Sequence, residues 1–272
     1  MNKYDRCMQD VINEIEKNLE YVTIEDLIQI SGYSYYHFHR IFKAYTGESL
    51  KKYIKRLQLE KALHKMQMDK ENITTLALEA GFNMSSSFNK AFKEMFATNP
   101  TKYKQSLSKQ RESYKDIKPI RVEDIKPIEV YVIRYMGEYE LVNIAWDKII
   151  SFATQHKLFN RDFSAFGITY DNPNVTNNEK LRYDVCITKT KDIALEENSE
   201  IYTKTLAGGR YAIFLHKGNP KGLIDVFNSI FGKWLYESDI KLRDVPVLQK
   251  MLNDKSKVLI DDLLIEIFIP IE

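Results

Sequence analysis

Polar side chains recur at the spacing i, i+3, i+4 and i+7, which places residues on one face of a helix. They are Tyr36, His39, Arg40 and Lys43. An arginine can donate two hydrogen bonds to guanine O6 and N7, a histidine can hydrogen-bond a base edge, and tyrosine rings can contact thymine methyl groups or a phosphate. This face, together with the neighbouring Tyr35, therefore predicts contact with base edges in a DNA groove.

A second polar face of this kind follows about 50 residues later. Its candidate residues are Ser85, Ser86, Asn89, Lys90 and Lys93. These side chains are shorter or suited to phosphates, so we expect this face to add affinity with less base discrimination. A solvated helix face is an equal alternative for any single lysine. The clustering of positive charge favours contact with DNA over a solvated face. Residues 30–110 hold 14 Lys and Arg against 6 Asp and Glu, whereas the whole chain has a net charge of +2.

Glu266 lies in the apolar segment 263–269 and could hold a charged ligand. Side chains of a strand alternate between two faces, so Glu266 shares its face with Leu264 and Phe268. A carboxylate there is costly to bury without a partner, and a cationic ligand would supply one. Aromatic side chains that could add cation-π contacts are Tyr139, Phe166, Tyr170, Tyr183 and Trp234, with Phe268 beside the carboxylate. The alternative is a solvated face at a sheet edge.

Each polar helix face must be positioned by a preceding helix and a tight turn. In the first copy, Thr23 and Asp26 are spaced for a capping box, and Gly32 suits a left-handed turn. Ser34 is a good N-cap for the helix that carries the face, and Gly47 ends that helix. The first copy therefore predicts a helix-turn-helix.

The second copy repeats this pattern, with Gly81 at the turn and Ser85 as the expected N-cap. Between the copies, residues 50–68 contain no Gly or Pro and predict one connecting helix. At about 1.5 Å per residue this helix spans about 28 Å, close to the roughly 34 Å between successive major grooves on one side of DNA. One chain is therefore expected to reach two grooves.

Residues 20–106 resemble the DNA-binding domain of AraC/XylS-family transcription regulators. The matching stretches are Asp26-Leu27, Gly32-Tyr33-Ser34, residues 38–43, Gly47, Ala80-Gly81-Phe82, residues 88–93 and residues 99–103. The resemblance implies two recognition helices in adjacent major grooves of a bent, asymmetric site, and contact with RNA polymerase. The family usually has glycine where Ala97 stands, which leaves the local turn open.

The composition changes after this region and predicts a second domain. A polar linker at residues 107–119 separates a DNA-binding domain at residues 1–106 from residues 120–272. In the latter, residues 130–137 match residues 211–218 at an offset of 81, and a helical stretch and two strands follow each. The predicted fold is multidomain: an all-α double helix-turn-helix domain, then an α+β domain of two strand-helix-strand-strand repeats that pair about a pseudo-twofold axis.

The second half resembles the GyrI-like ligand-binding domain of multidrug-responsive regulators. The matching stretches are residues 137–140, Phe166-Gly167, residues 170–173, residues 181–184, residues 208–211, Trp234-Leu235 and residues 267–270. The resemblance implies a pocket for hydrophobic, often cationic, small molecules, with a glutamate on the last strand. Two alternatives remain open: hydrolysis of small electrophilic compounds, with Glu266 as general base and Tyr139 as its helper, or a protein-interaction module.

Other chemistry is not indicated. Cys7 and Cys186 form no CxxC motif, and His37 and His39 point to different sides of a helix, so neither a metal nor a cofactor is predicted. No catalytic motif, signal peptide or apolar run of about 18 residues is present. Residues 182 and 184 alternate onto one face and predict structural ion pairs with neighbours. We therefore expect a bacterial, cytoplasmic transcription regulator, an activator and not an enzyme, whose partners are double-stranded DNA, a small-molecule effector and RNA polymerase.

Overall fold

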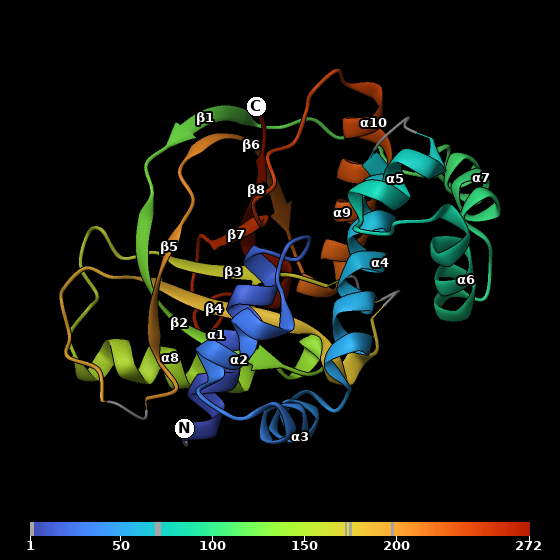
Figure 1. Ribbon diagram of the computed structural model, residues 1–272. Coiled ribbons are helices and arrows are strands. Elements are labelled where there is room, and N and C mark those ends of the chain that lie inside the picture. The colour runs from blue at the N-terminus through green and yellow to red at the C-terminus, as the bar shows by residue number, and fades with distance from the viewer. Residues whose placement is uncertain (1–2, 69–71, 172, 174–175, 197–198) are drawn as a thin grey trace. The chain divides into compact units, whose positions relative to one another are not determined.

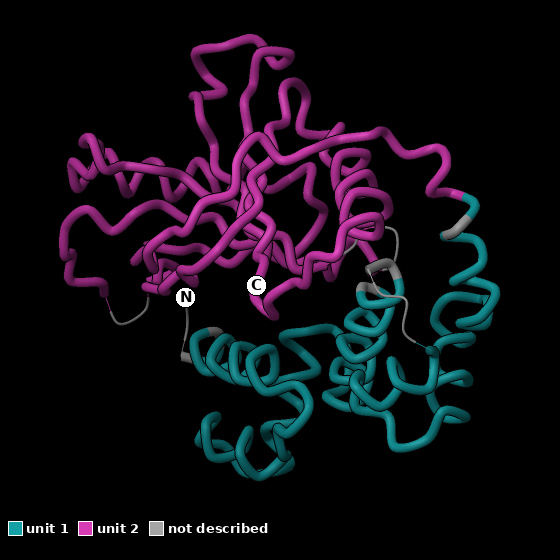
Figure 2. The backbone as a smooth tube through the Cα atoms, turned by 90° about the horizontal axis from the view of Figure 1, so that it is seen from above, with its two compact units in different colours: residues 1–109 teal, residues 110–272 magenta. Residues whose placement is uncertain are grey.

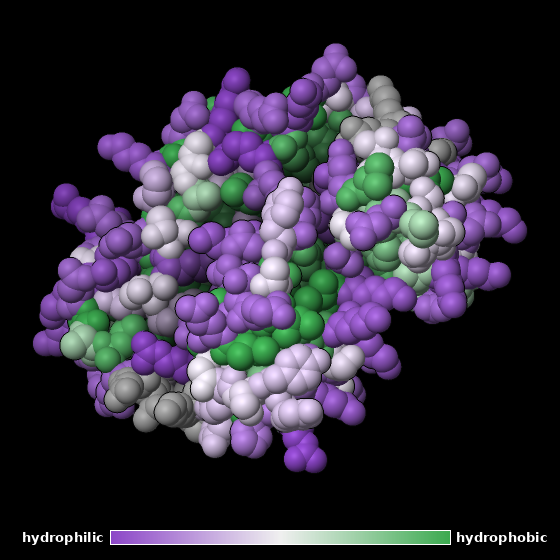
Figure 3. Space-filling model, in the orientation of Figure 1, coloured by the Kyte–Doolittle hydropathy of each residue, from purple (hydrophilic) through white to green (hydrophobic). Residues whose placement is uncertain are grey.

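The chain folds into two compact units, residues 1–109 and 110–272 (Figure 2). The computed structural model describes residues 3–68, 72–171, 173, 176–196 and 199–272. Within these ranges no helix is long and apolar enough to cross a membrane. On the surface seen in Figure 3, hydrophilic residues predominate and hydrophobic residues form scattered patches.

The first unit is helical (Figure 1). Its helices are α1 (Lys3–Lys17), α2 (Ile24–Ser31), α3 (Tyr35–Thr46), α4 (Leu50–Met68), α5 (Ile73–Glu79), α6 (Ser85–Phe96) and α7 (Pro100–Arg111), of which the last two residues belong to the second unit. The pairs α2–α3 and α5–α6 are the two predicted helix-turn-helix motifs, and α4 is the predicted connecting helix. The double helix-turn-helix fold is therefore confirmed.

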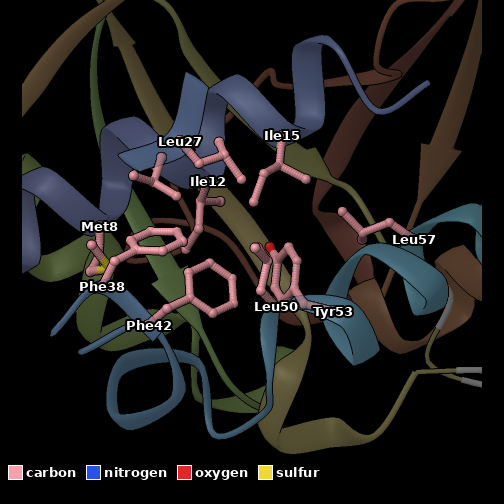
Figure 4. Packing of buried hydrophobic residues seen from close by; sticks show 10 residues of the cluster. Met8, Ile12, Ile15, Leu27, Phe38, Phe42, Leu50, Tyr53 and Leu57 are labelled. Carbon is pink, nitrogen blue, oxygen red and sulfur yellow. The ribbon is translucent and has the colours of Figure 1, made fainter. Parts of the chain in front are cut away.

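The sequence interpretation did not include α1, whose apolar side packs against the first motif. Its apolar residues Met8, Val11, Ile12 and Ile15 are fully or almost fully buried. They pack against α2, α3 and the first half of α4 in one cluster (Figure 4), to which the other helices contribute Leu27, Phe38, Phe42, Leu50, Tyr53 and Leu57. The polar helix face of α3 is thus held by a core built from four helices.

The turn residues of the first motif behave largely as expected. The Thr23 hydroxyl accepts from the Asp26 amide and the Asp26 carboxylate accepts from the Thr23 amide, which forms the predicted capping box. Gly32 and Gly47 are left-handed, with φ of 66° and 74°, a conformation that costs little only for glycine. Ser34 occupies the N-cap position of α3, but its side chain makes no capping hydrogen bond.

The second motif departs from expectation at both ends of α6. The N-cap is Met84 in an extended conformation, and Ser85 is already the first helical residue, so the predicted Ser85 cap is wrong. At the other end, Ala97 ends the helix in the left-handed region with φ of 53°. Alanine keeps the turn that glycine usually makes, at the cost of a close contact between Cβ and the backbone.

Changing Ala97 to glycine is therefore expected to raise the free energy of unfolding by about 0.5–1 kcal/mol. Relief of the left-handed strain, about 1–2 kcal/mol, outweighs the extra freedom that glycine gives the unfolded chain. Ala44→Gly, the same change at an exposed right-handed position of α3, is the matched control and should lose about 1 kcal/mol. Thermal unfolding followed by circular dichroism measures both, and a loss of stability in both variants would contradict the strain.

The second unit is built on one eight-stranded antiparallel sheet. Its strands are β1 (Arg121–Ile125), β2 (Ile128–Met136), β3 (Ala165–Thr169), β4 (Arg182–Thr188), β5 (Tyr202–Leu206), β6 (Gly209–Lys217), β7 (Leu248–Met251) and β8 (Leu264–Pro270). Its helices are α8 (Asn143–Gln155), α9 (Leu223–Ser229), the π-helical turn η4 (Ile230–Trp234) and α10 (Leu235–Glu237). The α+β fold of two repeats is confirmed, and each repeat has one further strand at its start, β1 and β5.

The two repeats exchange these first strands. The strand order is β1-β6-β8-β7-β3-β4-β2-β5, so β1 pairs with β6 of the second repeat and β5 pairs with β2 of the first. In the centre β3 pairs with β7, which joins the halves into one sheet as the predicted pseudo-twofold requires.

All the longer helices of this unit cover the same face of the sheet. Helix α8 packs on Tyr131, Ile133, Tyr183 and Val185. The strand pairing places Phe214 on the same face of the sheet, and Phe214 contacts Trp234 of η4.

Most of the other, helix-free face is nevertheless buried. Residues of β2 and β5, at one end of the strand order, and of β6, near the other end, belong to one apolar cluster there. The sheet therefore curls around this face (Figure 1), and its own side chains pack there.

Candidate functional site

The polar face of α3 is largely open to solvent. Tyr36 is 81% exposed, Tyr35 is 51% exposed, and Arg40 and Lys43 are also exposed. Phe38 and Phe42 point into the core from the opposite side of the helix. The fold thus presents four of the five predicted base-contacting side chains on one outer surface of the helix.

His39 differs from its neighbours on this face. It is half-buried, with its ring 4.5 Å from the Tyr35 ring centroid in an edge-on contact. Its Nε2 is buried and has no hydrogen-bond partner in the described chain. His39 therefore contacts the Tyr35 ring in this conformation, and a direct hydrogen bond between its Nε2 and a base would require the atoms that cover Nε2 to move.

Four of the five residues predicted for the second polar face are exposed. Ser86, Asn89, Lys90 and Lys93 of α6 are exposed, while Ser85 is half-buried at the start of the helix. Phe88, Ala91 and Phe92 hold α6 from its inner side. Neither motif has an acidic residue on the first turn of its exposed helix, so negative charge there does not repel phosphates.

The predicted ligand set divides between the two faces of the sheet. Phe166, Tyr170, Glu266 and Phe268 lie on the helix-free face. Tyr139 and Tyr183 pack against each other on the helix-covered face, and Trp234 contacts Phe214 there. Strand alternation separates adjacent residues such as 183 and 184, so the structure does not bring these three aromatic residues to the carboxylate.

Glu266 is buried and already has a cationic partner from its own chain. The Nη1 and Nη2 atoms of Arg121 each donate to one carboxylate oxygen, at 2.5 and 3.0 Å. The side chain of Glu266 is 9% exposed, whereas that of Arg121 is 40% exposed. The hydrogen bond with Glu266 raises the pKa of Arg121 above its ordinary value, so this guanidinium stays charged. Arg121 therefore covers the carboxylate from the solvent side.

A second buried acid, Asp184, lies on the same face and is more fully neutralised. It pairs with Arg134, and it also accepts from Lys204 at 3.1 Å and from the Tyr170 hydroxyl at 2.6 Å. Burial alone would raise the pKa of Asp184, but Arg134 and Lys204 lower it to about 2. Nearby, Arg182 pairs with Asp171. The predicted structural ion pairs of residues 182 and 184 are thus confirmed.

The two acids occupy equivalent places in the two repeats. Asp184 is the third residue of β4 and Glu266 is the third residue of β8. Across the ladder, Asp184 faces Arg134, whereas Glu266 faces Leu215, which is 44% exposed. In the described chain Glu266 thus keeps a single ion-pair partner, supplied by the edge strand β1.

The aromatic faces beside these acids also hold cations of the chain. The Nζ of Lys250, which lies opposite Glu266 in the ladder, is 6.0 Å from the Phe166 ring centroid. Arg134 and Lys204 lie 4.5 and 5.2 Å from the Tyr170 ring. A cationic ligand on this face must therefore replace a residue that the protein already provides.

The sequence interpretation missed Arg121 and Lys204, although a signal was present. The offset of 81 extends upstream of the recognised repeat, where Ile120 corresponds to Ile201 and Ile125 to Leu206. This extension marks β1 and β5 as parts of the repeats, and the cations of these strands then become candidates for the acids. Among the described residues, no group of three or more His, Cys, Asp or Glu is arranged to hold a metal ion.

Comparisons with known proteins agree with this division. Residues 118–272 match the family model of the GyrI-like small molecule binding domain, and residues 27–106 match a helix-turn-helix domain model. The uncharacterized HTH-type transcriptional regulator YbfP of Bacillus subtilis is 34% identical over 120 residues, 42% of this chain and 41% of YbfP. The multiple antibiotic resistance protein MarA of Escherichia coli is 33% identical over 36% of this chain and 79% of its own length. The transcriptional regulator Rob of Salmonella typhimurium is 20% identical over 83% of both chains.

Proposed function

Because the chain belongs to the GyrI-like small molecule binding domain family, here joined to an AraC-type helix-turn-helix DNA-binding domain of a transcription regulator, we propose how each half acts. The α3 face reads base edges and the α6 face adds contacts to phosphates. The helix-free face of the second unit takes a hydrophobic effector whose positive group pairs with Glu266. Effector occupancy then alters the activity of the DNA-bound protein.

The surroundings of Glu266 carry the effector half of this proposal. A buried carboxylate on an apolar face needs a positive partner, and the present partner is a half-exposed side chain from an edge strand. The equivalent acid Asp184 is closed in by Arg134, Lys204 and Tyr170. The end of the face at Glu266 is therefore the one that an external cation can reach.

Replacing Glu266 with glutamine is expected to abolish a preference for cations. The loss of a charge-assisted contact of about 1.5–3 kcal/mol should weaken binding of a biphenylmethyl-trimethylammonium ion by about 10- to 100-fold. Binding of the neutral tert-butyl isostere should change little. Calorimetric titration of the full chain measures both.

Glu138→Gln, at an exposed acid of the same domain, is the matched control and should bind like the wild type. If the wild type binds the ion and its isostere equally, Glu266 is not a counter-charge. If neither probe binds, a protein partner becomes the better candidate for this domain.

The hydrolytic alternative is not favoured by the placement of its two residues. Tyr139 lies with Tyr183 on the helix-covered face, where its hydroxyl donates to the backbone oxygens of Asp171 and Arg182. Burial raises the pKa of Tyr139, which makes it a poor proton donor. Glu266 is on the other face, so Tyr139 is not positioned to assist it as a general base.

We also propose that the regulator works in the cytoplasm as an activator that contacts RNA polymerase, as its AraC-type domain implies. Transcription in vitro from a selected binding site, with and without an effector, distinguishes activation from repression.

A further inference from the structure

We propose that Arg121 is a built-in competitor of the effector. In the free domain its guanidinium pairs with the Glu266 carboxylate. A cationic effector binds by displacing this guanidinium, and the displacement loosens β1 and the linker that leads into β1. This inference rests on the proposed function of the Glu266 site. It adds a residue that sets effector selectivity. It also gives the route by which effector binding is transmitted from the domain to the linker.

The contacts of Arg121 make it easy to displace. Its Nε donates to Glu123, two residues further along β1, at 2.8 Å, and both side chains are about half exposed. When an effector takes Glu266, Arg121 therefore keeps a carboxylate partner in contact with water. Arg134, by contrast, is 4% exposed beside Asp184 and would lose its charge partner in a buried environment, which is far more costly.

Strand β1 is also the strand most easily released. It pairs only with β6 in the strand order, and four of its five residues are exposed. Edge elements with few buried contacts open at low free energy. The bidentate pair of Arg121 with Glu266 is thus a large part of what holds the start of this strand.

The segment before β1 is fastened to the same unit at two places. At its far end, the Tyr114 ring packs so closely on Gly232 of η4 that a Cβ there would lie 2.3 Å from ring carbon Cε2, and the Arg111 guanidinium lies 3.3 Å from the Tyr236 ring centroid. At its near end, the Ile120 amide donates to the Ile213 oxygen at 2.7 Å, next to Arg121. Release of Arg121 frees the near end, so the length of chain that can move increases.

The test compares probe binding in full-length Arg121→Ala, Arg121→Lys and wild type, with Arg210→Ala as the control. Arg210 is exposed and lies on the other face of β6, so its removal takes away one positive charge without changing the face that carries Glu266. Removing the competitor should tighten binding of the biphenylmethyl-trimethylammonium ion about two- to fivefold, the worth of a half-exposed ion pair. Arg121→Lys should fall between, and the neutral isostere should bind all variants equally.

Hydrogen exchange of the Ile120 amide provides a readout that does not depend on affinity. Exchange should speed up at least fivefold in ligand-free Arg121→Ala, and equally in the wild type saturated with the ammonium ion, while α8 amides stay protected. Unchanged exchange in both would overturn the proposed release.

The outcomes separate this inference from the proposed function. If the wild type prefers the ion through Glu266 but Arg121→Ala binds it like Arg210→Ala, the competitor is disproved and the effector site stands. If neither the wild type nor Arg121→Ala distinguishes the ion from its isostere, both are disproved.

Discussion

Replacing Asp184 with asparagine is expected to lower the free energy of unfolding of the second unit by about 3–5 kcal/mol at pH 7, because it breaks a buried ion pair by removing the carboxylate that Arg134 contacts. The substitution keeps the size of the side chain, so packing changes little. Lys204 is 32% exposed and can turn to solvent, but Arg134 cannot. Urea unfolding followed by tryptophan fluorescence measures this unit alone, since Trp146 and Trp234 both belong to it.

The loss should depend on pH in a defined direction. The pKa of Asp184 falls from 3.8 to about 2 on folding, so the folded state favours the carboxylate. This contribution, about 2 kcal/mol, is complete above about pH 5 and disappears as the pH falls from about 4 towards 2. The difference between wild type and Asp184→Asn should therefore shrink over that range.

Asp147→Asn is the matched control, because Asp147 is exposed on α8, and it should change stability by less than about 0.5 kcal/mol. A difference between wild type and Asp184→Asn that stayed constant down to pH 3 would show that the ion pair is not its cause.

Removing the Arg40 side chain is expected to weaken specific DNA binding and to relax the sequence preference. A bidentate contact with guanine is worth about 1–3 kcal/mol, so Arg40→Ala should lose about 5- to 150-fold in affinity for a selected site and much less for random DNA. Competition binding over a library of sites at fixed salt measures both quantities. An unchanged sequence preference would show that Arg40 does not read bases.

Lys93→Ala provides the contrast on the second helix. If α6 mainly contacts phosphates, this variant should bind all sequences more weakly by a similar factor, and its slope of log affinity against log salt should decrease by about one. Lys17→Ala, at an exposed lysine at the end of α1, controls for the loss of one positive charge and should retain the sequence preference. A preference that changed in Lys93→Ala would mean that α6 also discriminates bases.

The helical half was predictable because its signals are local. Gly32, Gly47 and the apolar spacing of α3 act within a few residues, and the capping pair Thr23 and Asp26 formed as expected. Helix α1 was not predicted, although Met8, Val11, Ile12 and Ile15 have helical spacing, because most of the first ten residues are polar. The cap of α6 was missed because Met84 holds the extended conformation that a polar cap usually takes.

The ligand site was only half predictable because it depends on contacts between distant strands. Alternation correctly placed Glu266 beside Phe268, but whether Tyr183 and Trp234 share that face depends on strand order and register, which the sequence does not contain. The partner of Glu266 lies 145 residues away on a strand that crosses to the other repeat. The sequence therefore indicates which aromatic residues suit a cation, but not which of them share the face of Glu266 or which cations of the chain already lie there.

The exchange of β1 and β5 is the arrangement of a swapped dimer whose two copies have been joined into one chain. In a dimer of identical subunits every substitution appears twice, so both acids would have the same neighbours. A single chain removes this restriction. Arg134 neutralises one acid inside the domain, while Leu215, in the equivalent place, leaves the other acid to the exchangeable partner that we propose. Joining the halves thus allows one acid of a symmetrical scaffold to serve stability and the other to serve the proposed sensing.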